Sequence, residues 1–513
     1  MLKIHEFKEG NGFAPPCEVY INGRPASPTF ARVSAVPHNE WWRGRQRDPK
    51  DTETAPFVSF ESDEPVKVRV ISDKLKTAAE VIVRPQSKGV SVTRGDGEAV
   101  FSLSRHGAYT FEIDGFHEAL HLFYNPERDF LSEETRSGRK ILHYAAGVHE
   151  IGTVEIGSHT SVVLDAGAVV YGSFTAIHAE DIRICGYGII DGGKEIRTDD
   201  TLLLPTAMKP AGNSGAELVY TDEDRTNETI LREKMRDMRM LNGCIRFYSC
   251  RDFSVEGVIM RDAATFCLIP AASERFVIDN VKTIGMWRYN SDGIDLFNCS
   301  DAVIRNCFLR NFDDCIVIKG IVGWEKRNNE NILVENCVVW CDWGSALEIG
   351  AETNAPAYRN ITFRNCDVIH GQSAVMRIQH HNAAAIEDIL YDGICAEFTK
   401  HQLPGKIIED GKPYDGQENT GHPELIVLVI VADGKYGKEK RRGTIENVRI
   451  RNTRVFTDGE VKMPISAFLG ADEAHKVKNA TVENVYLNGA LVPDYDAVIR
   501  RMKYTENIRY EVS

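Results

Sequence analysis

Apolar and polar residues alternate along much of the chain, and short turn segments separate the alternating runs. In the first quarter the alternation is regular at residues 66–70, 108–113 and 119–123. A period of two residues is typical of strands with one buried face, and the Pro and Gly residues between the runs predict tight connections. We therefore expect a small antiparallel β-sandwich over residues 1–126.

A recurring tripeptide marks the rest of the chain: an apolar residue, a variable residue, and then Asn or Gly. It occurs at residues 184–186, 255–257, 278–280, 304–306, 334–336, 363–365, 391–393, 450–452 and 482–484. From Gly257 to Gly393 its third positions are 23, 26, 30, 29 and 28 residues apart. A period in this range indicates stacked supersecondary units, and the Val, Ile and Phe residues at alternate positions indicate that each unit is made of strands.

The repeat favours a right-handed parallel β-helix over other solenoids. No amphipathic helix separates the repeats, as leucine-rich repeats require, and no Trp-Asp signature marks the blade of a propeller. In a β-helix the coils lie about 4.8 Å apart, so that equivalent residues stack. Asn and Gly tolerate the left-handed backbone of a corner, which makes the repeated Asn residues structural. The predicted fold class is all-β, a right-handed parallel β-helix preceded by a small antiparallel β-sandwich.

The chain divides further at its charged and irregular segments. Residues 127–140 are rich in charge and are predicted to be a linker, and residues 141–513 form the β-helix domain. Two insertions interrupt the repeat, at 192–241 and 400–443, and the first of them includes a predicted helix near residues 228–240. Long loops on a solenoid usually gather at its working face.

Composition narrows the possible functions. The chain has 75 acidic and 61 basic residues and a net charge of −14, which disfavours binding to nucleic acid. No apolar run approaches the length of a membrane-spanning helix, and residues 1–6 lack an apolar export core. We therefore expect a cytoplasmic protein, or a secreted or periplasmic one if a leader has been removed. The 12 cysteines show no C-x-x-C spacing and are expected to be buried, reduced thiols.

Two acidic clusters stand within the regular repeat, at residues 290–295 and 312–316. Asp292 and Asp313 are 21 residues apart, close to one coil, so we expect them to lie one above the other on the same face. Carboxylates this close cannot all ionise, so one holds a proton and acts as an acid while the others act as bases. Such a split is the machinery of glycoside hydrolysis. Calcium binding is the main competing interpretation, because close carboxylates also suit a hard cation.

Residues 242–379 resemble the family 28 glycoside hydrolases, the polygalacturonase family, and the related family 49 dextranases. The family signature Asn-Thr-Asp-Gly-(Phe/Ile)-Asp is similar to residues 290–295, and its Gly-Asp-Asp-Cys is similar to residues 312–315. The sandwich ahead of the repeat is more like the dextranase family. The resemblance implies a right-handed parallel β-helix in which Asp313 is the general acid. It also implies that Asp292 and Asp314 position and deprotonate the attacking water, with inversion at the anomeric carbon.

The chain departs from the family pattern at two places. Gly344-Ser345-Ala346 stands where the family has Gly-His-Gly, so that the supporting histidine is absent unless His370, His380 or His381 replaces it. Arg377-Ile378-Gln379 stands where the family has Arg-Ile-Lys, whose Arg and Lys grip the substrate carboxylate. Loss of the Lys favours a neutral sugar, or an acid that is held differently.

Further residues near these motifs are expected to bind the substrate. Glu348 lies in a strand near the missing histidine and is expected to contact a hydroxyl group or to replace a catalytic function. Trp287 and Trp343 lie near the acidic clusters, where exposed indoles would stack on sugar faces. The predicted substrate-binding residues are Asp295, Glu348, Arg377, Gln379, Trp287, Trp343 and His380.

The sequence thus predicts an inverting glycoside hydrolase that acts on an α-linked oligo- or polysaccharide, with no cofactor, no metal, and neither nucleic acid nor membrane as partner. The two insertions are expected to close one end of the substrate site, which favours exo action. A polysaccharide lyase or a glycosyl-transferring β-helix enzyme is one alternative, and a non-catalytic glycan-binding β-helix is another. The sequence leaves open the sugar, the linkage, the oligomeric state and whether a metal ion sits in the groove.

Overall fold

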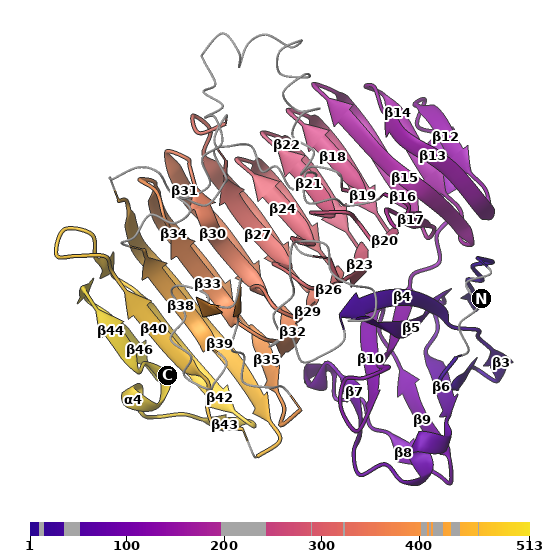
Figure 1. Cartoon of the computed structure of the whole chain (residues 1–513), viewed down its shortest axis with the longest axis horizontal. Coiled ribbons are helices and arrows are strands. Elements are labelled where there is room, and N and C mark those ends of the chain that lie inside the picture. Colours follow the sequence, from indigo (N-terminus) through magenta and orange to yellow (C-terminus); the bar gives the residue numbers. More distant parts are fainter. Residues whose placement is uncertain are drawn as a thin grey trace.

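The computed structural model describes residues 1–9, 15–34, 52–195, 243–288, 290–321, 324–401, 408–409, 412–413, 424–431, 442–459 and 461–512. Over these residues the chain forms a sandwich of two sheets that lies beside a long parallel β-helix (Figure 1). This confirms the predicted fold class. The helix predicted near residues 228–240 lies outside the described residues.

The sandwich is built from the alternating runs at the start of the chain. One sheet contains β1 (Lys3–Ile4), β4 (Thr29–Ser34), β5 (Thr52–Glu61), β7 (Val81–Arg84), β10 (Gly107–Ile113) and β11 (Leu120–Asn125). The other contains β2 (Glu18–Ile21), β3 (Arg24–Pro25), β6 (Val66–Ile71), β8 (Thr93–Arg94) and β9 (Glu98–Leu103). Their apolar faces share one core. The strand pairs are antiparallel except for β5 and β11, which are parallel.

Each coil of the β-helix contributes strands to three parallel sheets, which we call the outer, docking and site sheets. The outer sheet contains β12 (Lys140–Tyr144), β14 (Thr160–Leu164), β16 (Glu180–Gly186), β19 (Arg251–Glu256), β22 (Glu274–Asp279), β25 (Ser300–Arg305), β28 (Asn329–Glu335), β31 (Ala357–Arg364), β34 (Ala385–Asp392), β39 (Thr444–Thr457), β41 (Val477–Lys478), β42 (Thr481–Leu487), β45 (Thr505–Glu506) and β46 (Arg509–Glu511). The docking sheet contains β17 (Ile189–Asp191), β20 (Ile259–Arg261), β23 (Lys282–Met286), β26 (Phe308–Asn311), β29 (Val338–Cys341), β32 (Asp367–Gly371) and β35 (Cys395–Phe398).

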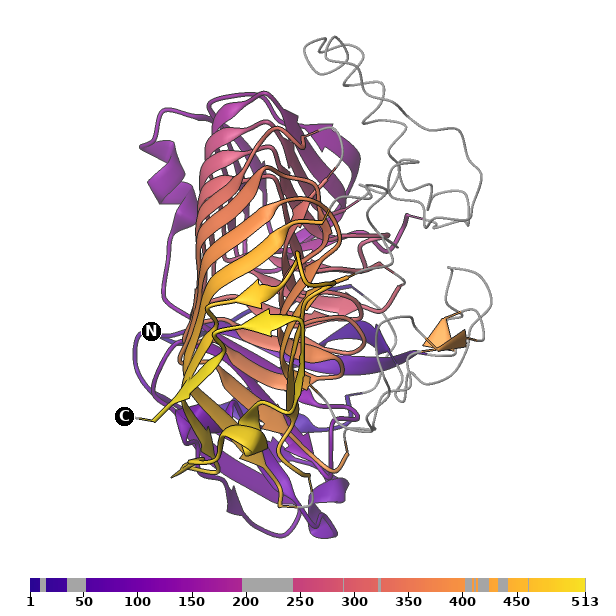
Figure 2. The ribbon, with the colours of Figure 1, turned by 90° about the vertical axis from the view of Figure 1, so that its left-hand side faces the viewer.

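The site sheet follows the docking sheet in each coil. It contains β18 (Ile245–Tyr248), β21 (Leu268–Ala271), β24 (Ile294–Phe297), β27 (Ile316–Gly320), β30 (Leu347–Thr353), β33 (Ala374–His380), β38 (Glu424–Ile430), β40 (Ile465–Leu469) and β44 (Arg501–Lys503). The long strands β13 (Gly147–Glu155) and β15 (Ala168–Ile177) run across both of these sheets in the first coils. Figure 2 looks along the stack from its C-terminal end, so that the coils lie one behind another.

The remaining elements are short. They are the 3₁₀ turns η2 (Asp73–Lys76) and η3 (Gln86–Lys88), the helices α1 (Phe130–Thr135) and α4 (Tyr495–Val498), the two-residue strand β43 (Ala490–Leu491), and the hairpin of β36 (Ile408–Glu409) and β37 (Lys412–Pro413). None of the helices in the described part of the chain is long and apolar enough to cross a membrane.

The repeated Asn and Gly residues form the corner between the outer and docking sheets. Asn280, Asn306, Asn336 and Asn365 have φ between 52° and 57°, in the left-handed region where Asn is tolerated better than most residues. The repeat therefore marks a structural corner, as predicted. Aromatic residues stack from coil to coil in the interior, and the rings of Phe253 and Phe276 are 4.6 Å apart. Of the 12 cysteines, which are all free thiols, 11 are buried.

The stretch predicted as a linker contains a packed helix. Asp129 caps the start of α1 by accepting a hydrogen bond from the backbone N–H of Ser132. Glu134, near the other end of α1, is 1% exposed and pairs with Arg139 at 3.0 Å and with Arg183 of β16. The charged residues of this stretch therefore form ion pairs that join it to the first coils of the β-helix.

The sandwich packs against the docking sheet through an apolar layer and a buried ion network. Phe57 and Phe123 of the sandwich share a core cluster with Ile259, Phe308 and other residues of the docking sheet. A second contact is ionic. The Arg84 guanidinium lies 2.8 Å from Glu112 within the sandwich and also pairs with Glu397 of β35, with all three side chains buried. The sandwich therefore covers the docking sheet and leaves the site sheet to the other side of the helix.

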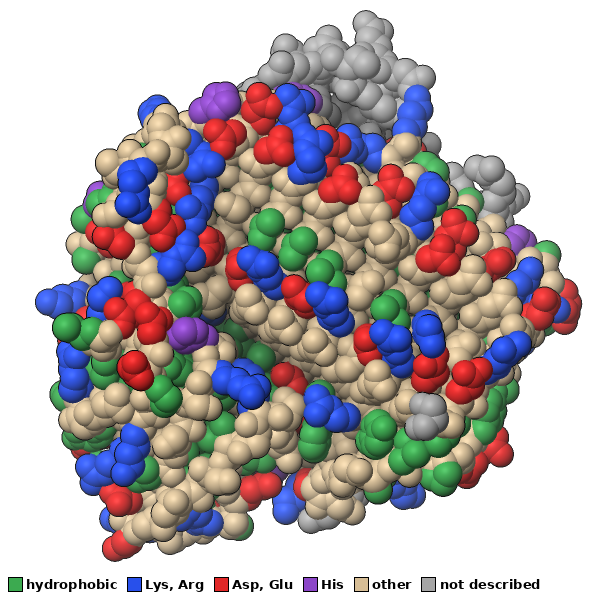
Figure 3. Space-filling model, turned by 180° about the vertical axis from the view of Figure 1, so that it is seen from behind, with side chains coloured by type: hydrophobic (Ala, Val, Ile, Leu, Met, Phe, Trp, Pro, Cys, Tyr) green, Lys and Arg blue, Asp and Glu red, His purple; other side chains and the backbone are tan. Residues whose placement is uncertain are grey.

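Charged side chains are interspersed on the outside of the molecule. On the face seen in Figure 3, acidic and basic residues alternate and do not gather into one basic patch. Pairs of opposite charge on neighbouring outer-sheet strands contribute to such a pattern, as for Arg305 and Asp279 at 2.8 Å.

Candidate active site

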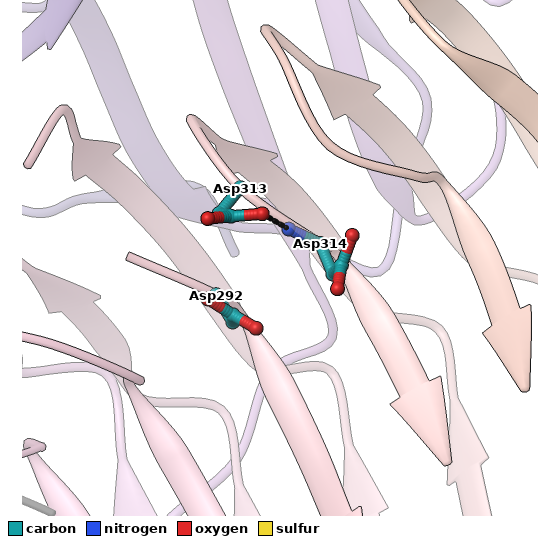
Figure 4. Close-up of side chains that lie close together, drawn as sticks. All are labelled: Asp292, Asp313 and Asp314. Carbon is teal, nitrogen blue, oxygen red and sulfur yellow. Dashed lines mark hydrogen bonds between the residues drawn. The ribbon is translucent and has the colours of Figure 1, made fainter. Parts of the chain in front are cut away.

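Three aspartates meet in the turns that lead from the docking sheet into the site sheet. Asp292 precedes β24, and Asp313 and Asp314 precede β27. One carboxylate oxygen of each residue lies within 4.8 Å of those of the other two, and Figure 4 shows the three side chains grouped together. Asp292 and Asp313 are buried and Asp314 is partly exposed. The structure thus brings together the three residues that the sequence analysis predicts as the catalytic set.

Asp313 and Asp314 share one site because they lie in a turn. Consecutive residues of a straight strand would point to opposite faces. Here the carboxylate of Asp313 accepts a hydrogen bond of 3.1 Å from the backbone N–H of Asp314 (Figure 4). The carboxylate of Asp314 accepts another, of 2.9 Å, from the backbone N–H of Ser345 in the next coil. Main-chain donors therefore hold both carboxylates in place.

Asp314, rather than Asp313, occupies the rung directly beside Asp292. Ile294 of β24 pairs with Ile316 of β27, which is 22 residues later in the chain. The same offset places Asp292 beside Asp314. The backbone N–H of Gly293 accordingly donates to the carbonyl oxygen of Asp314 at 2.8 Å. The stacking predicted for Asp292 and Asp313 is therefore displaced by one residue, because this coil is one residue longer than their spacing.

A buried lysine, which the sequence analysis missed, lies among these carboxylates. The Nζ atom of Lys319 is 2.7 Å from Asp292, 3.3 Å from Asp295 and 3.6 Å from Asp314. It sits on β27, in the same coil as Asp314. One ammonium group thus faces three carboxylates, and it compensates part of the repulsion between them.

The position of Lys319 follows from the alternation of β27. Ile316 and Ile318 belong to the interior core, so Val317 and Lys319 point outward from the site sheet. The same alternation on β24 places Asp295 on the outward face, since Ile294 and Leu296 are core residues. The sequence therefore contained a signal for Lys319: it is a cation at an outward-facing position of the strand that follows the acidic turn.

Burial and mutual repulsion shift the pKa values of these carboxyl groups upward. Burial, with a smaller contribution from Asp314, raises the pKa of Asp292 to about 7, and Lys319 limits that rise. Burial and the charges of Asp292 and Asp314 raise the pKa of Asp313 well above its usual value. Burial likewise raises the pKa of Asp295. This shift favours the protonated form of Asp313, the form that a general acid needs.

The lysine keeps its own proton. Burial alone would lower the pKa of Lys319, but the charges of Asp292, Asp295 and Asp314 outweigh burial and hold that pKa well above its usual value. A protonated ammonium stabilises nearby carboxylates and cannot remove a proton from a substrate.

The next two coils add a hydrogen-bonded group beside the aspartates. Arg377 of β33 donates from Nη1 to the hydroxyl of Ser345 at 3.0 Å and to that of Ser373 at 3.2 Å. Glu348 of β30 is the strand partner of Arg377, and both residues point outward from the site sheet. Burial, followed by the charge of Asp314, raises the pKa of Glu348 to about 8.

Ser345 connects this group to the catalytic turn. Its backbone N–H holds Asp314, and its side chain contacts both Arg377 and Glu348. The residue stands at the position of the missing histidine, and its role was not predicted. Without knowledge of the register between β27 and β30, no sequence signal distinguishes it from an ordinary turn serine.

Two of the three predicted histidine replacements, His370 and His380, are wrong. His380 is fully buried, since Met376 and Ile378 of the same strand face the core and His380 follows them with the same parity. Its ring nitrogens bond to the Thr353 hydroxyl at 2.7 Å and to the Ala384 carbonyl oxygen at 2.9 Å. This leaves no ring nitrogen for a sugar.

His370 is also engaged elsewhere, whereas His381 lies beside a residue of the site sheet. His370 bonds to Glu112 of the sandwich at 2.6 Å, on the docking side of the helix. His381 is buried and its Nε2 atom lies 2.9 Å from the amide nitrogen of Gln379. Gln379 itself points outward from the site sheet, two residues beyond Arg377 on the same strand.

The two tryptophans predicted to be exposed to sugar are mostly buried. Trp287 is 4% exposed, and its indole N–H donates to Asp262 at 2.7 Å. Trp343 is 9% exposed and stacks on Phe312, with ring centroids 5.4 Å apart. The expectation of open stacking platforms is therefore wrong for both indoles, because their large apolar surfaces complete the packing of the turns beside the aspartates.

A family model supports the resemblance seen in the sequence. Residues 224–431 match the model of glycosyl hydrolases family 28, a range that includes all three aspartates and Lys319. The middle of the chain is similar to family 28. The resemblance drawn from the two acidic motifs is thereby confirmed at the level of the family.

Comparison with individual proteins gives partial matches. The chain is 32% identical to a probable rhamnogalacturonase A of Aspergillus oryzae over 128 residues, 24% of this chain and 25% of the relative. It is 22% identical to a dextranase of Arthrobacter globiformis over 203 residues, 37% of this chain and 27% of that protein. The matched segments thus span about a quarter of the length of each relative.

A solved structure extends the likeness to nearly the whole chain. Dex49A from Penicillium minioluteum superposes with a TM-score of 0.54 at 12% identity, covering 96% of this chain and 86% of that one. At this identity the comparison supports the fold alone. It supports the arrangement of a sandwich ahead of a parallel β-helix.

Proposed function

We propose that this protein is a glycoside hydrolase that cleaves an α-linked oligo- or polysaccharide with inversion at the anomeric carbon. The observation that carries the proposal is the group of Asp292, Asp313 and Asp314 around Lys319. The pKa of Asp313 lies well above its usual value, and the carboxylate oxygens of all three residues lie within 4.8 Å of one another, close enough to hold one water molecule. The similarity of residues 224–431 to family 28 supports the same chemistry.

The reaction needs two proton transfers that this group can supply. Asp313 gives its proton to the glycosidic oxygen, and the bond between that oxygen and the anomeric carbon breaks. A water molecule held by Asp292 and Asp314 attacks the same carbon, and one of these carboxylates takes the proton of the water. The Lys319 ammonium lies beside both of these proposed bases, and it limits the rise in the pKa of Asp292.

The stereochemical outcome is proposed from the family resemblance. Carboxyl groups about 5 Å apart usually indicate retention, whereas inverting enzymes usually separate them by more than about 6 Å. The oxygens here lie within 4.8 Å, so that distance alone would favour retention. We propose inversion because the acidic motifs are those of family 28, and because two aspartates are available to hold one water molecule between them.

We further propose that the substrate is neutral at the sugar that faces Arg377 and Gln379. The family's Arg-Ile-Lys provides two cations for a uronate, and Gln379 offers none. Nη1 of Arg377 is already bonded to two serine hydroxyls, and the Lys319 ammonium is shared by three carboxylates. Exo action remains a prediction from the two insertions, most of which lie outside the described residues.

A lyase is the less favoured alternative. β-Elimination requires a base that removes a proton beside a uronate carboxylate, and Lys319 is held in its protonated form. A non-catalytic glycan-binding protein would have no need of a buried acid that is kept protonated next to two bases.

The proposal is tested by incubating the protein with a panel of α-linked oligosaccharides, both neutral and uronic. Chromatography identifies the products, and proton NMR in the first minutes reports the anomer released. Hydrolysis that gives the inverted anomer supports the proposal. An unsaturated product points to a lyase, and binding without turnover across the panel points to a glycan-binding protein.

A further inference from the structure

A second cavity lies in the sandwich, away from the site sheet. Its volume is about 720 Å³, within the range of about 300–1,000 Å³ that is common for ligand sites. It is lined by residues of η3, β6, β8, β9 and β10 and of the loops that join them, all of them within the sandwich. No step of the proposed hydrolysis uses it.

The lining of this cavity is basic and rich in hydroxyl groups. Lys67, Lys88 and Arg105 contribute three cations, and six further side chains, four Ser, one Thr and one Tyr, carry hydroxyl groups. None of the described lining residues carries a carboxylate. This is unexpected in a chain with a net charge of −14, and a local field of this kind attracts anions.

Two of the three cations of the cavity lack acidic partners among the described residues. Within the described part of the chain, neither Lys67 nor Arg105 forms an ion pair, although exposed Arg69 on the same strand as Lys67 pairs with Glu98 at 2.7 Å. Lys67 lies beside Ser102 in the sheet register, so a cation and a hydroxyl face the cavity together.

Lys88 is held in the wall of the cavity. Its Nζ atom donates to the carbonyl oxygen of Ala108 at 3.0 Å and lies 4.1 Å from the ring centroid of Tyr109. Burial, reinforced by the charge of Arg105, lowers the pKa of Lys88 to about 8, and Asp367 of the docking sheet partly offsets this. Asp367 accepts a hydrogen bond from Ser87 at 2.5 Å. An anion in the cavity would relieve the repulsion between Lys88 and Arg105.

We propose that this cavity is a second carbohydrate site, which binds an anionic saccharide. Lys67 and Arg105 would hold the carboxylate or sulfate group, and the surrounding Ser and Thr hydroxyls would bond to the sugar hydroxyls. The volume suits a short oligosaccharide better than a single small ion. The site is independent of the aspartates and of whether they hydrolyse anything.

The test is isothermal titration calorimetry on the whole chain carrying Asp313→Asn, which stops turnover. The probes are an α-linked galacturonate trisaccharide, its neutral galactose counterpart, and inorganic sulfate. The variant is Lys67→Gln with Arg105→Gln, since both side chains are exposed and their replacement leaves the core intact. The matched control is Arg69→Gln, on the same strand and the same face but outside the cavity.

We expect the uronate trisaccharide to bind. The double variant should weaken that binding about tenfold or more, because it removes charge-assisted contacts. Arg69→Gln should leave the affinity unchanged, and the neutral trisaccharide should bind at this site more weakly. Equal uronate affinity in the double variant, or no uronate binding at millimolar concentration, would overturn the proposal. If sulfate binds as tightly as the trisaccharide, the site recognises anions only and its assignment to saccharides is wrong.

Discussion

The ammonium of Lys319 lies 2.7 Å from a carboxylate oxygen of Asp292, on the neighbouring coil of the helix. The two residues are 27 positions apart in the chain, and only the stacking of β24 on β27 brings them together. This pair matters for the proposed mechanism because the ammonium limits the rise in the pKa of Asp292, while the pKa of Asp313 stays well above its usual value.

Replacing Lys319 should therefore change the pH dependence of hydrolysis. In Lys319→Met the pKa of Asp292 should rise above its present value of about 7, so that the base ionises only at higher pH. We expect kcat at pH 6 to fall about tenfold or more, and the rising limb of the pH profile to move upward by about one unit or more. KM should change little.

Lys319→Arg is the control for that prediction, because it retains the positive charge and should retain part of the activity and most of the wild-type pH profile. A Lys319→Met profile that is lower at every pH but not displaced would show that Lys319 acts only on packing.

Asp313→Asn should remove the proposed general acid. The amide has the same shape but has no acidic proton to give to the leaving group, so we expect kcat to fall about a thousandfold or more while the oligosaccharide still binds. The measurement is turnover together with calorimetric binding. Asp301→Asn is the matched control, since Asp301 lies in the outer sheet with φ of 53°, where Asn is well tolerated. Full activity of Asp313→Asn would exclude this residue as the acid.

Glu348 should make the protein less stable as the pH rises. Its pKa is about 8 in the folded protein and about 4.5 as a free group, so between these values the folded state holds the proton more tightly than the unfolded state. Raising the pH between these two pKa values then lowers the free energy of unfolding, by up to about 1.4 kcal/mol per pH unit. Glu348→Gln should flatten this slope.

The measurement is urea denaturation of the wild type and of Glu348→Gln between pH 5 and pH 9. The two free energies of unfolding should differ in their pH dependence between about pH 4.5 and 8 and run parallel above that range. Parallel curves throughout would mean that Glu348 is ionised in the folded protein.

Gln379→Lys should shift substrate preference toward uronic sugars. The substitution restores the second cation of the Arg-Ile-Lys motif on the outward face of β33, two residues from Arg377. We expect the ratio of kcat/KM for a uronic over a neutral oligosaccharide to rise about tenfold, through KM. Gln379→Met, which is neutral and of similar size, is the control and should not raise the ratio.

Removal of divalent ions should leave hydrolysis unchanged. The three aspartates have oxygens close enough for a hard cation, but the Lys319 ammonium already lies against Asp292 and Asp314, and a second positive charge there would be repelled. Turnover before and after treatment with a chelator tests this. Loss of activity that calcium restores would support the competing metal interpretation.

Much of the fold follows from local sequence pattern. The corner residues Asn280, Asn306 and Asn336 recur because each coil needs a residue with a left-handed backbone at the same place. This requirement appears in the sequence as a regular spacing of Asn residues. The meeting of Asp292 with Asp314 depends on the length of one coil, which the sequence gives only to within a residue or two.

The remaining parts of the site depend on what a side chain meets after folding. Lys319 could be placed on the outward face by alternation, but its pairing with three carboxylates required the register of two strands. Trp287 and His380 were misassigned because residue type alone does not separate an aromatic ring that fills a turn from one that meets a ligand. Burial decides between these roles, and burial is a property of the assembled coils.

The buried guanidinium of Arg84 has a consequence for any attempt to divide the chain. The guanidinium forms ion pairs with Glu112 in its own domain and with Glu397 in the β-helix. The apolar layer between the two domains is buried only when both are present. Expressed separately, the β-helix would expose an apolar face that contains the unpaired carboxylate of Glu397, and the sandwich would expose its own apolar face beside the Arg84–Glu112 pair. An engineered chimera should therefore take both sides of this interface from the same protein.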